Sequence, residues 1–126
     1  MTPRYRVIVA DANPSVRENL RYLIASEEDM QCVAAASDGR GCVSLCRELA
    51  PDVLVLGDDV IGLSALTVAR AIAAEVPATR VILYTLDAEL CDQGSLLASA
   101  CVLKDATYDA LLHAIRTSLS LYAPLA

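Results

Sequence analysis

Residues 52–59 have the sequence Asp-Val-Leu-Val-Leu-Gly-Asp-Asp, in which four apolar residues are followed by a glycine and two carboxylates. A short, continuous apolar run of this kind is typical of a strand that is buried on both faces of a parallel sheet. In open α/β sheets, ligands bind at the carboxyl ends of such strands. Residues 57–59 are therefore the first candidates for a functional site.

Four further apolar runs and five amphipathic segments surround this strand. Strands are predicted over residues 6–10, 31–36, 80–85 and 100–103, and helices over residues 14–24, 42–49, 65–75, 89–97 and 108–119. Gly94 interrupts the fourth helix and weakens that assignment. Strands that alternate with helices through short connections predict an α/β fold. The expected architecture is a doubly wound, five-stranded parallel sheet of order 2-1-3-4-5, which is flavodoxin-like, with five helices.

The length and composition restrict the class of protein. The chain has 126 residues, which suits one domain, and 56% of them are hydrophobic, enough for a core and for some apolar surface at a partner. The net charge of −6 disfavours direct contact with nucleic acid or an anionic membrane. No apolar run reaches the length of a membrane span, and the amino terminus lacks the layout of a signal peptide. We therefore expect a cytoplasmic protein.

The cysteines are expected to be small apolar core residues. Their number is odd and their spacing is wide, which disfavours a disulfide framework. Cys42 and Cys46 lie one helical turn apart, and a metal site there is the less favoured alternative because His113, the single histidine, is distant in sequence. The five cysteines are Cys32, Cys42, Cys46, Cys91 and Cys101.

Polar residues follow four of the predicted strands. Asp11 ends the first, residues 57–59 end the third, Thr85 ends the fourth and Lys104 ends the fifth. The strand order brings these ends together, and carboxylates, a hydroxyl and an ammonium suit a divalent cation and a phosphoryl group. Singly, each has an ordinary explanation: a turn carboxylate, a β-branched strand residue or a solvated charge. Lys104 is the only lysine in the chain, and the combination is more specific than any one member.

Four segments resemble the receiver domain of bacterial two-component response regulators, in particular the LuxR/NarL-type transcription factors. They are VIVADANPSVRENL at 7–20, APDVLVL at 50–56, TRVILYT at 79–85 and VLKDA at 102–106. The resemblance extends without gaps from Arg6 to Leu119. It implies that an acidic pair after the first strand holds magnesium, that an aspartate after the third accepts a phosphoryl group, and that a threonine or serine and a lysine bind its oxygens. Asp11, Thr85 and Lys104 match this pattern.

The chain departs from the family pattern at several positions. Ala12 replaces the second acidic residue, Gly57 replaces the phosphoacceptor aspartate, Cys101 replaces the switch aromatic residue and Ile61 replaces a proline. Making Asp58 the acceptor instead would require an inserted residue in an alignment that is otherwise gapless.

These departures imply a degenerate phosphorylation pocket. We expect no metal site, with Asp11 and Asp59 as weak candidates, and magnesium at most weakly bound. Lys104 is expected to pair with Asp11 or Asp58 without a metal, which locks the pocket. Strand alternation predicts that Asp58 points away from the pocket, and phosphorylation there is the less favoured alternative.

The expected function is that of an atypical, phosphorylation-independent receiver module, with residues 1–120 as the domain and 121–126 as the start of a linker to a DNA-binding helix-turn-helix domain. A homodimer through helical faces and a sensor kinase or other regulatory partner are expected, with no membrane contact. The sequence does not choose between the dimer faces that the family uses. The alternative is a small-molecule sensor that uses a vacated pocket near Gly57. An enzyme is not expected, because no nucleophile and base meet at the strand ends.

Overall fold

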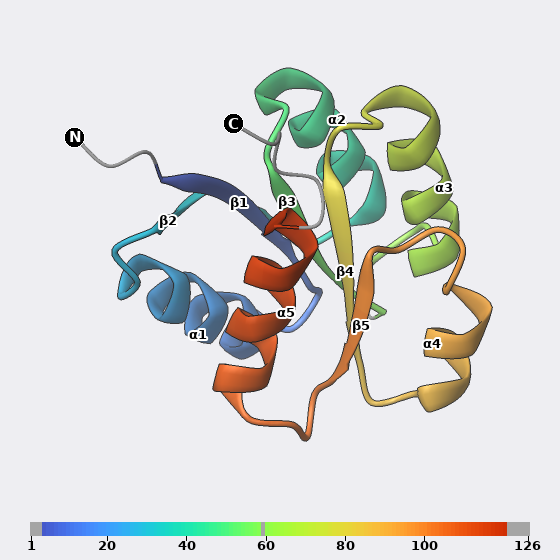
Figure 1. Cartoon of the computed structure of the whole chain (residues 1–126). Coiled ribbons are helices and arrows are strands. Elements are labelled where there is room, and N and C mark those ends of the chain that lie inside the picture. Colours follow the sequence, from blue (N-terminus) through green and yellow to red (C-terminus); the bar gives the residue numbers. More distant parts are fainter. Residues whose placement is uncertain (1–3, 59, 121–126) are drawn as a thin grey trace.

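The computed structural model describes residues 4–58 and 60–120, and strands alternate with helices along these residues (Figure 1). The strands are β1 (Tyr5–Ala10), β2 (Met30–Ala36), β3 (Val53–Gly57), β4 (Arg80–Thr85) and β5 (Ala100–Leu103). The helices are α1 (Pro14–Ala25), α2 (Gly39–Leu49), α3 (Ala65–Glu75), α4 (Ala88–Gln93) and α5 (Tyr108–Ser120). The linker predicted at 121–126 lies outside the described residues.

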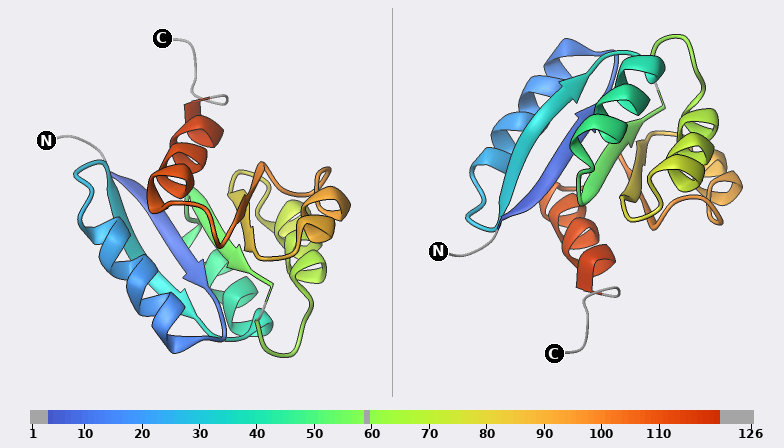
Figure 2. Two further views of the ribbon diagram at one scale, coloured as in Figure 1. Left: turned by 90° about the horizontal axis from the view of Figure 1, so that it is seen from below. Right: turned by 90° about the horizontal axis from the view of Figure 1, so that it is seen from above.

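The strands form one parallel sheet of order β2-β1-β3-β4-β5, which confirms the predicted topology. Helices α1 and α5 cover one face, while α2 and α3 cover the other, with α4 at its β5 edge (Figure 2). The three central strands are buried on both faces, which is why their sequences are continuous apolar runs.

Two apolar cores lie on opposite faces of the sheet because successive side chains of a strand alternate in direction. In β3, Leu54 and Leu56 pack with α2 and α3, while Val53 and Val55 pack with α1 and α5. All four side chains are fully buried. Strand β3 thus contributes to both cores, and Gly57 at its end lies directly beside them.

Helix α4 is shorter than predicted, and Gly94 accounts for the difference. The helix ends at Gln93, and the N–H of Gly94 donates to the carbonyl oxygen of Leu90 as the C-cap. Gly94 is buried, and a Cβ at this position would lie 2.5 Å from Cδ1 of Leu83. A side chain at this position would therefore have to displace Leu83 where the chain leaves α4 beside β4.

The prediction for the cysteines is correct for one pair and wrong for another. Cys42 and Cys46 are fully buried in the core beneath α2, as expected. Cys91 and Cys101, however, form a disulfide between α4 and β5. The sequence does not reveal this pairing, because a helix and the strand after it can bring two cysteines together at several different spacings. The number of cysteines alone does not show which two are close.

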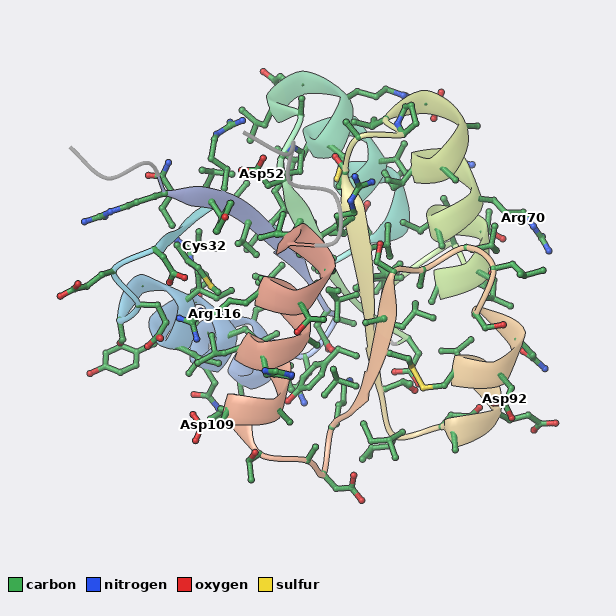
Figure 3. All side chains as sticks on the ribbon, viewed as in Figure 1. Cys32, Asp52, Arg70, Asp92, Asp109 and Arg116 are labelled. Carbon is green, nitrogen blue, oxygen red and sulfur yellow. A yellow bond between two sulfur atoms is a disulfide. The ribbon has the colours of Figure 1, made fainter. Side chains whose placement is uncertain are left out.

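Arg116 of α5 connects the last helix to the turn between α1 and β2 (Figure 3). Its guanidinium group donates two hydrogen bonds to the carboxylate of Asp29, each of 2.9 Å, and one of 2.7 Å to Glu27. The hydrogen bonds from Arg116 hold the pKa of Asp29 below its ordinary value of 3.8, against a smaller opposing effect of burial.

Replacing Arg116 with methionine should therefore lower the free energy of unfolding at pH 7 by roughly 0.5–1 kcal/mol, a modest loss because these groups are partly exposed and screened. Because the folded-state pKa of Asp29 is lowered, the stabilisation is present above 3.8 and is lost as the pH falls through the folded-state value. Urea unfolding from neutral pH down to about pH 3 should show the difference between variant and wild type shrinking. Arg47→Met, which breaks the single and more exposed pair with Glu75, is the control and should cost less. A pH-independent difference would contradict the prediction.

None of the helices within the described residues has the length and apolar character that crossing a lipid bilayer requires.

Candidate functional site

The carboxyl ends of β1, β3, β4 and β5 meet at one edge of the sheet and bring four polar residues together. These are Asp11, Asp58, Thr85 and Lys104, and all of them were predicted to lie here. Each follows or ends a buried strand, so the register of the parallel sheet sets their positions.

Asp11 is completely buried, and its carboxylate is held from two sides. Oδ1 accepts a hydrogen bond of 2.9 Å from the backbone N–H of Asn13. Oδ2 lies 2.9 Å from Nζ of Lys104, a contact made by charge rather than by a well-aligned hydrogen bond. Arg17 fixes the backbone of Asp11 by donating a hydrogen bond of 2.9 Å to its carbonyl oxygen. The carboxylate therefore has little freedom to move.

Gly57 ends β3 directly against Asp11. A Cβ built on Gly57 would lie 2.3 Å from Oδ2 of Asp11, 2.9 Å from its Cγ and 3.1 Å from the carbonyl oxygen of Ala10. The first two separations are closer than real Cβ atoms approach. The space that a Cβ of Gly57 would take is thus occupied by the Asp11 carboxylate.

Lys104 lies between the two carboxylates of the site. Its Nζ is 2.9 Å from Asp11 and 3.6 Å from Asp58, and its side chain is only 12% exposed. The ammonium also lies 5.9 Å from the ring centroid of Tyr84, in cation–π range. Burial raises the pKa of Tyr84 and outweighs the lowering by Lys104. Lys104 therefore bridges the two carboxylates of the site and is not a solvent-exposed surface charge.

Asp58 points into the site, so the prediction that it faces away was wrong. Its Oδ2 accepts a short hydrogen bond from the hydroxyl of Thr85, while Oδ1 faces Lys104. Strand alternation does not apply because β3 ends at Gly57 and Asp58 already lies in a turn. The side chain of Asp58 is 27% exposed, so it is the carboxylate of the site that solvent can reach.

Asp87 is a member of the hydrogen-bond network that the sequence did not reveal. Its backbone N–H donates to Oγ1 of Thr85 at 2.9 Å, and its carboxylate caps α4 by accepting from the N–H of Glu89. An aspartate just before a helix is a recognisable N-cap signal, although its link to Thr85 is not. Asp58, Thr85 and the start of α4 are therefore joined in one chain of hydrogen bonds.

The remaining predicted positions contribute no oxygen ligand among the described residues. Ala12 follows Asp11 without a polar side chain, and Cys101 is held in the disulfide. Ile61 is exposed, and its backbone pairs with the start of α2 through Gly39. Asp59, a weak candidate for a metal ligand, lies outside the described residues.

The described residues do not make a donor set suited to magnesium, which prefers six oxygens in an octahedral arrangement. Residues 4–58 and 60–120 contain no group of three or more acidic, histidine or cysteine side chains arranged to hold a metal ion. The two carboxylates that are present, Asp11 and Asp58, both face Lys104.

Comparisons with protein families, with curated proteins and with solved structures all find response regulators. The model of the response regulator receiver domain matches residues 7–116. YxjL of Bacillus subtilis, an uncharacterised transcriptional regulatory protein, is 34% identical over 118 residues, which are 91% of this chain and 54% of YxjL. A protein-glutamate methylesterase/protein-glutamine glutaminase of Myxococcus xanthus is 38% identical over 80 residues, 64% of this chain and 23% of that protein. The chain thus spans about half of YxjL and less of the methylesterase.

The fold is also that of a solved response regulator. A LuxR-family two-component response regulator from Aurantimonas superposes with a TM-score of 0.85 at 28% identity, and the match covers 93% of this chain and 86% of that one.

Proposed function

The chain belongs to the family of response regulator receiver domains, and we propose that this member signals without accepting a phosphoryl group at the end of β3. It is a receiver domain of two-component signalling that is related to LuxR-family regulators. In this proposal Asp11, Asp58 and Lys104 form a fixed ion-pair cluster that takes the place of the phosphorylation site. The domain then acts through its helical surfaces.

The observation that carries the proposal is the position of the Asp11 carboxylate in front of Gly57. An aspartyl phosphate needs a carboxylate at the acceptor position, and glycine offers none. The place of the missing side chain is taken by Asp11, which lies 2.9 Å from Lys104. The lysine that binds phosphoryl oxygens in the family is therefore already neutralised by carboxylates within the chain.

Magnesium is not part of the proposed mechanism. Active receiver domains bind Mg²⁺ at the phosphorylation site. Here the acidic partner of Asp11 is Ala12, and the acceptor position is Gly57, so two of the expected anionic groups are missing. Lys104 supplies the positive charge that offsets the remaining carboxylates, and it does so from a fixed position in the chain.

The output and partners follow from the family and from the charge of the chain. Receiver domains work with sensor kinases, and LuxR-type regulators dimerise and bind DNA through a separate domain. We propose the same arrangement here, in the cytoplasm, with a homodimer formed through the helical faces. The net charge of −6 supports DNA contact by another domain rather than by this one. Because one relative is a methylesterase, the competing arrangement is an output domain other than a DNA-binding one.

Phosphorylation at Asp58 is the second candidate, and one observation favours it. The Asp58 carboxylate contacts the hydroxyl of Thr85, faces Lys104 at 3.6 Å and is partly exposed. These are the side chains that bind phosphoryl oxygens in the family. Asp58 thus has the neighbours of an acceptor, one residue later in the chain than the family position.

Incubation with acetyl phosphate and magnesium, followed by intact-mass measurement, tests both candidates. We expect no stable gain of a phosphoryl group by the wild type, because Lys104 and Thr85 are engaged and the metal ligands are missing. A receiver domain with an acceptor aspartate, treated in parallel, is the positive control. A phosphoryl gain that Asp58→Asn abolishes would overturn the main proposal and establish the second. A gain that survives in Asp58→Asn would overturn both.

A further inference from the structure

The Cys91–Cys101 disulfide joins two elements that form one edge of the molecule. Cys91 lies in α4 and Cys101 in β5, ten residues later, with their Cα atoms 5.5 Å apart. The yellow bond between the two sulfur atoms lies between β5 and α4 in Figure 3. That separation is within the ordinary range for a disulfide. In the sheet, Cys101 pairs with Leu83 of β4, and its side chain lies on the core face that α4 covers. The bond therefore ties α4 directly to the edge strand.

Helix α4 has few other attachments. It has six residues, none of them buried, and Leu90 is the residue of the helix that packs against the core. At its end the N–H of Gly94 contributes a hydrogen bond to Leu90, which stays within the helix. A short helix with so little buried surface has low local stability. The disulfide is thus a principal anchor of α4 on the sheet.

The other end of the same segment enters the ion-pair cluster. The N–H of Asp87 donates to Thr85, and the hydroxyl of Thr85 donates to Asp58. The segment 85–91 is therefore hydrogen-bonded to Asp58 of the ion-pair cluster at its start and disulfide-bonded to Cys101 at its end. The hydrogen bond from Asp87 to Thr85 thus connects the start of α4 to the site.

The two bonded cysteines differ from the remaining three in pairing, and from Cys42 and Cys46 in accessibility as well. Cys91 and Cys101 are both partly exposed, so a small thiol can reach the bond. Cys42 and Cys46 are fully buried, whereas Cys32 is partly exposed, is not disulfide-bonded and has a pKa raised by burial. A thiolate is the reactive form in exchange, so buried and high-pKa thiols react slowly.

We propose that Cys91 and Cys101 form a reversible redox site that controls the anchoring of α4. To close the site, one cysteine thiolate attacks a low-molecular-weight disulfide of the glutathione class and releases one thiolate of it. The second cysteine thiolate then attacks the protein sulfur of the mixed disulfide and releases the other. The two protein thiols lose two protons and two electrons, and the small disulfide is reduced to two thiols. The reverse reaction frees α4 and loosens the contact between Asp87 and Thr85.

This site supplies an input that the proposed loss of phosphorylation does not affect, and it is independent of whether Asp58 accepts a phosphoryl group. Oxidation fixes the surface formed by α4 and β5, and reduction releases it. The redox state of two cysteines therefore controls how firmly this helical face is held.

The test is made on the whole chain in buffers with graded ratios of reduced to oxidised glutathione. Free thiols are trapped by alkylation and counted by intact mass, and hydrogen exchange is measured by mass spectrometry. We expect a reversible transition between no bond and one bond. On reduction, exchange in residues 86–94 should rise by about ten-fold or more, while β1 and β3 stay protected. The wild type alone provides this comparison, so it does not depend on a variant that folds.

Two variants identify the residues responsible. Cys91→Ser should show the fast exchange of the reduced protein in every buffer. Cys32→Ser, which removes an unbonded thiol, should retain the wild-type transition. The proposal is overturned if oxidised glutathione leaves a stable mixed disulfide on Cys91 or Cys101, if reduced glutathione does not open the bond, or if residues 86–94 exchange equally in both states.

Discussion

Replacing Lys104 with methionine is expected to lower the free energy of unfolding by about 3–5 kcal/mol, the usual cost of breaking a buried ion pair from one side. Asp11 is completely buried, and Lys104 lies 2.9 Å from its Oδ2. Without the ammonium of Lys104, the two carboxylates of Asp11 and Asp58 lose the positive charge that both of them contact. Methionine retains most of the length and apolar packing of the lysine, so the loss reports the charge. Urea unfolding followed by circular dichroism measures it.

The double variant Asp11→Asn/Lys104→Met separates the pair from the packing. Removing both charges leaves no buried unpaired carboxylate at Asp11, so the double variant should recover more than half of the loss. With the single variant Asp11→Asn, these measurements complete a double-mutant cycle, and its coupling energy is the strength of the interaction between the two residues. A Lys104→Met variant that costs less than about 1 kcal/mol would show instead that Asp11 is stabilised by other groups.

The fold could be predicted from the sequence because its signals are strong and local. The four-residue apolar run before Gly57, the Asn13-Pro14 helix start and the stop before Pro51 all agree with one topology, and each is present in the structure. Agreement between local signals and the overall fold is what makes an assignment dependable. Helix α4, which contains the conflicting Gly94, ends four residues before its predicted end, and α2 begins at Gly39, three residues before its predicted start.

The members of the site could be predicted, but their orientation could not. Strand order alone brings Asp11, Thr85 and Lys104 to one edge, since parallel strands end together. The direction of Asp58 depends on a turn, where the alternation of a strand no longer holds. The position of the Asp11 carboxylate depends on its rotamer and on the reach of Lys104. These are properties of side chains that are packed in three dimensions, and no spacing in the sequence encodes them.

The disulfide illustrates the same limit at longer range. Five cysteines allow many pairings, and the spacing between Cys91 and Cys101 is not a recognisable motif. The bond depends on where α4 leaves the sheet, which in turn depends on the buried Gly94. The sequence suggested that Cys101 occupies the switch position of the family. Only the fold shows that this position is covalently joined to the helix beside it.

Replacing Gly57 with alanine is expected to lower the free energy of unfolding by about 1–3 kcal/mol, the usual cost of forcing an extra carbon into a packed site. The new Cβ would lie 2.3 Å from Oδ2 of Asp11 and 3.1 Å from the carbonyl oxygen of Ala10. Asp11 cannot turn aside without loss, because one oxygen faces Lys104 and the other accepts from Asn13. Urea unfolding measures the cost, and the same data test whether Asp11 is its cause.

In an Asp11→Ala background the carboxylate is gone, and Gly57→Ala should then cost less than about 1 kcal/mol, since alanine also restricts the unfolded chain. Gly62→Ala is the matched control. Gly62 has a φ of +90° and open space around its Cβ position, so its cost is backbone strain and should be the same with or without Asp11. If Gly57→Ala is equally costly in both backgrounds, the backbone of Ala10 is the obstacle. A rescue confined to Gly57 would mean that Asp11 occupies the acceptor position, and that an aspartate restored there must first displace an ion pair.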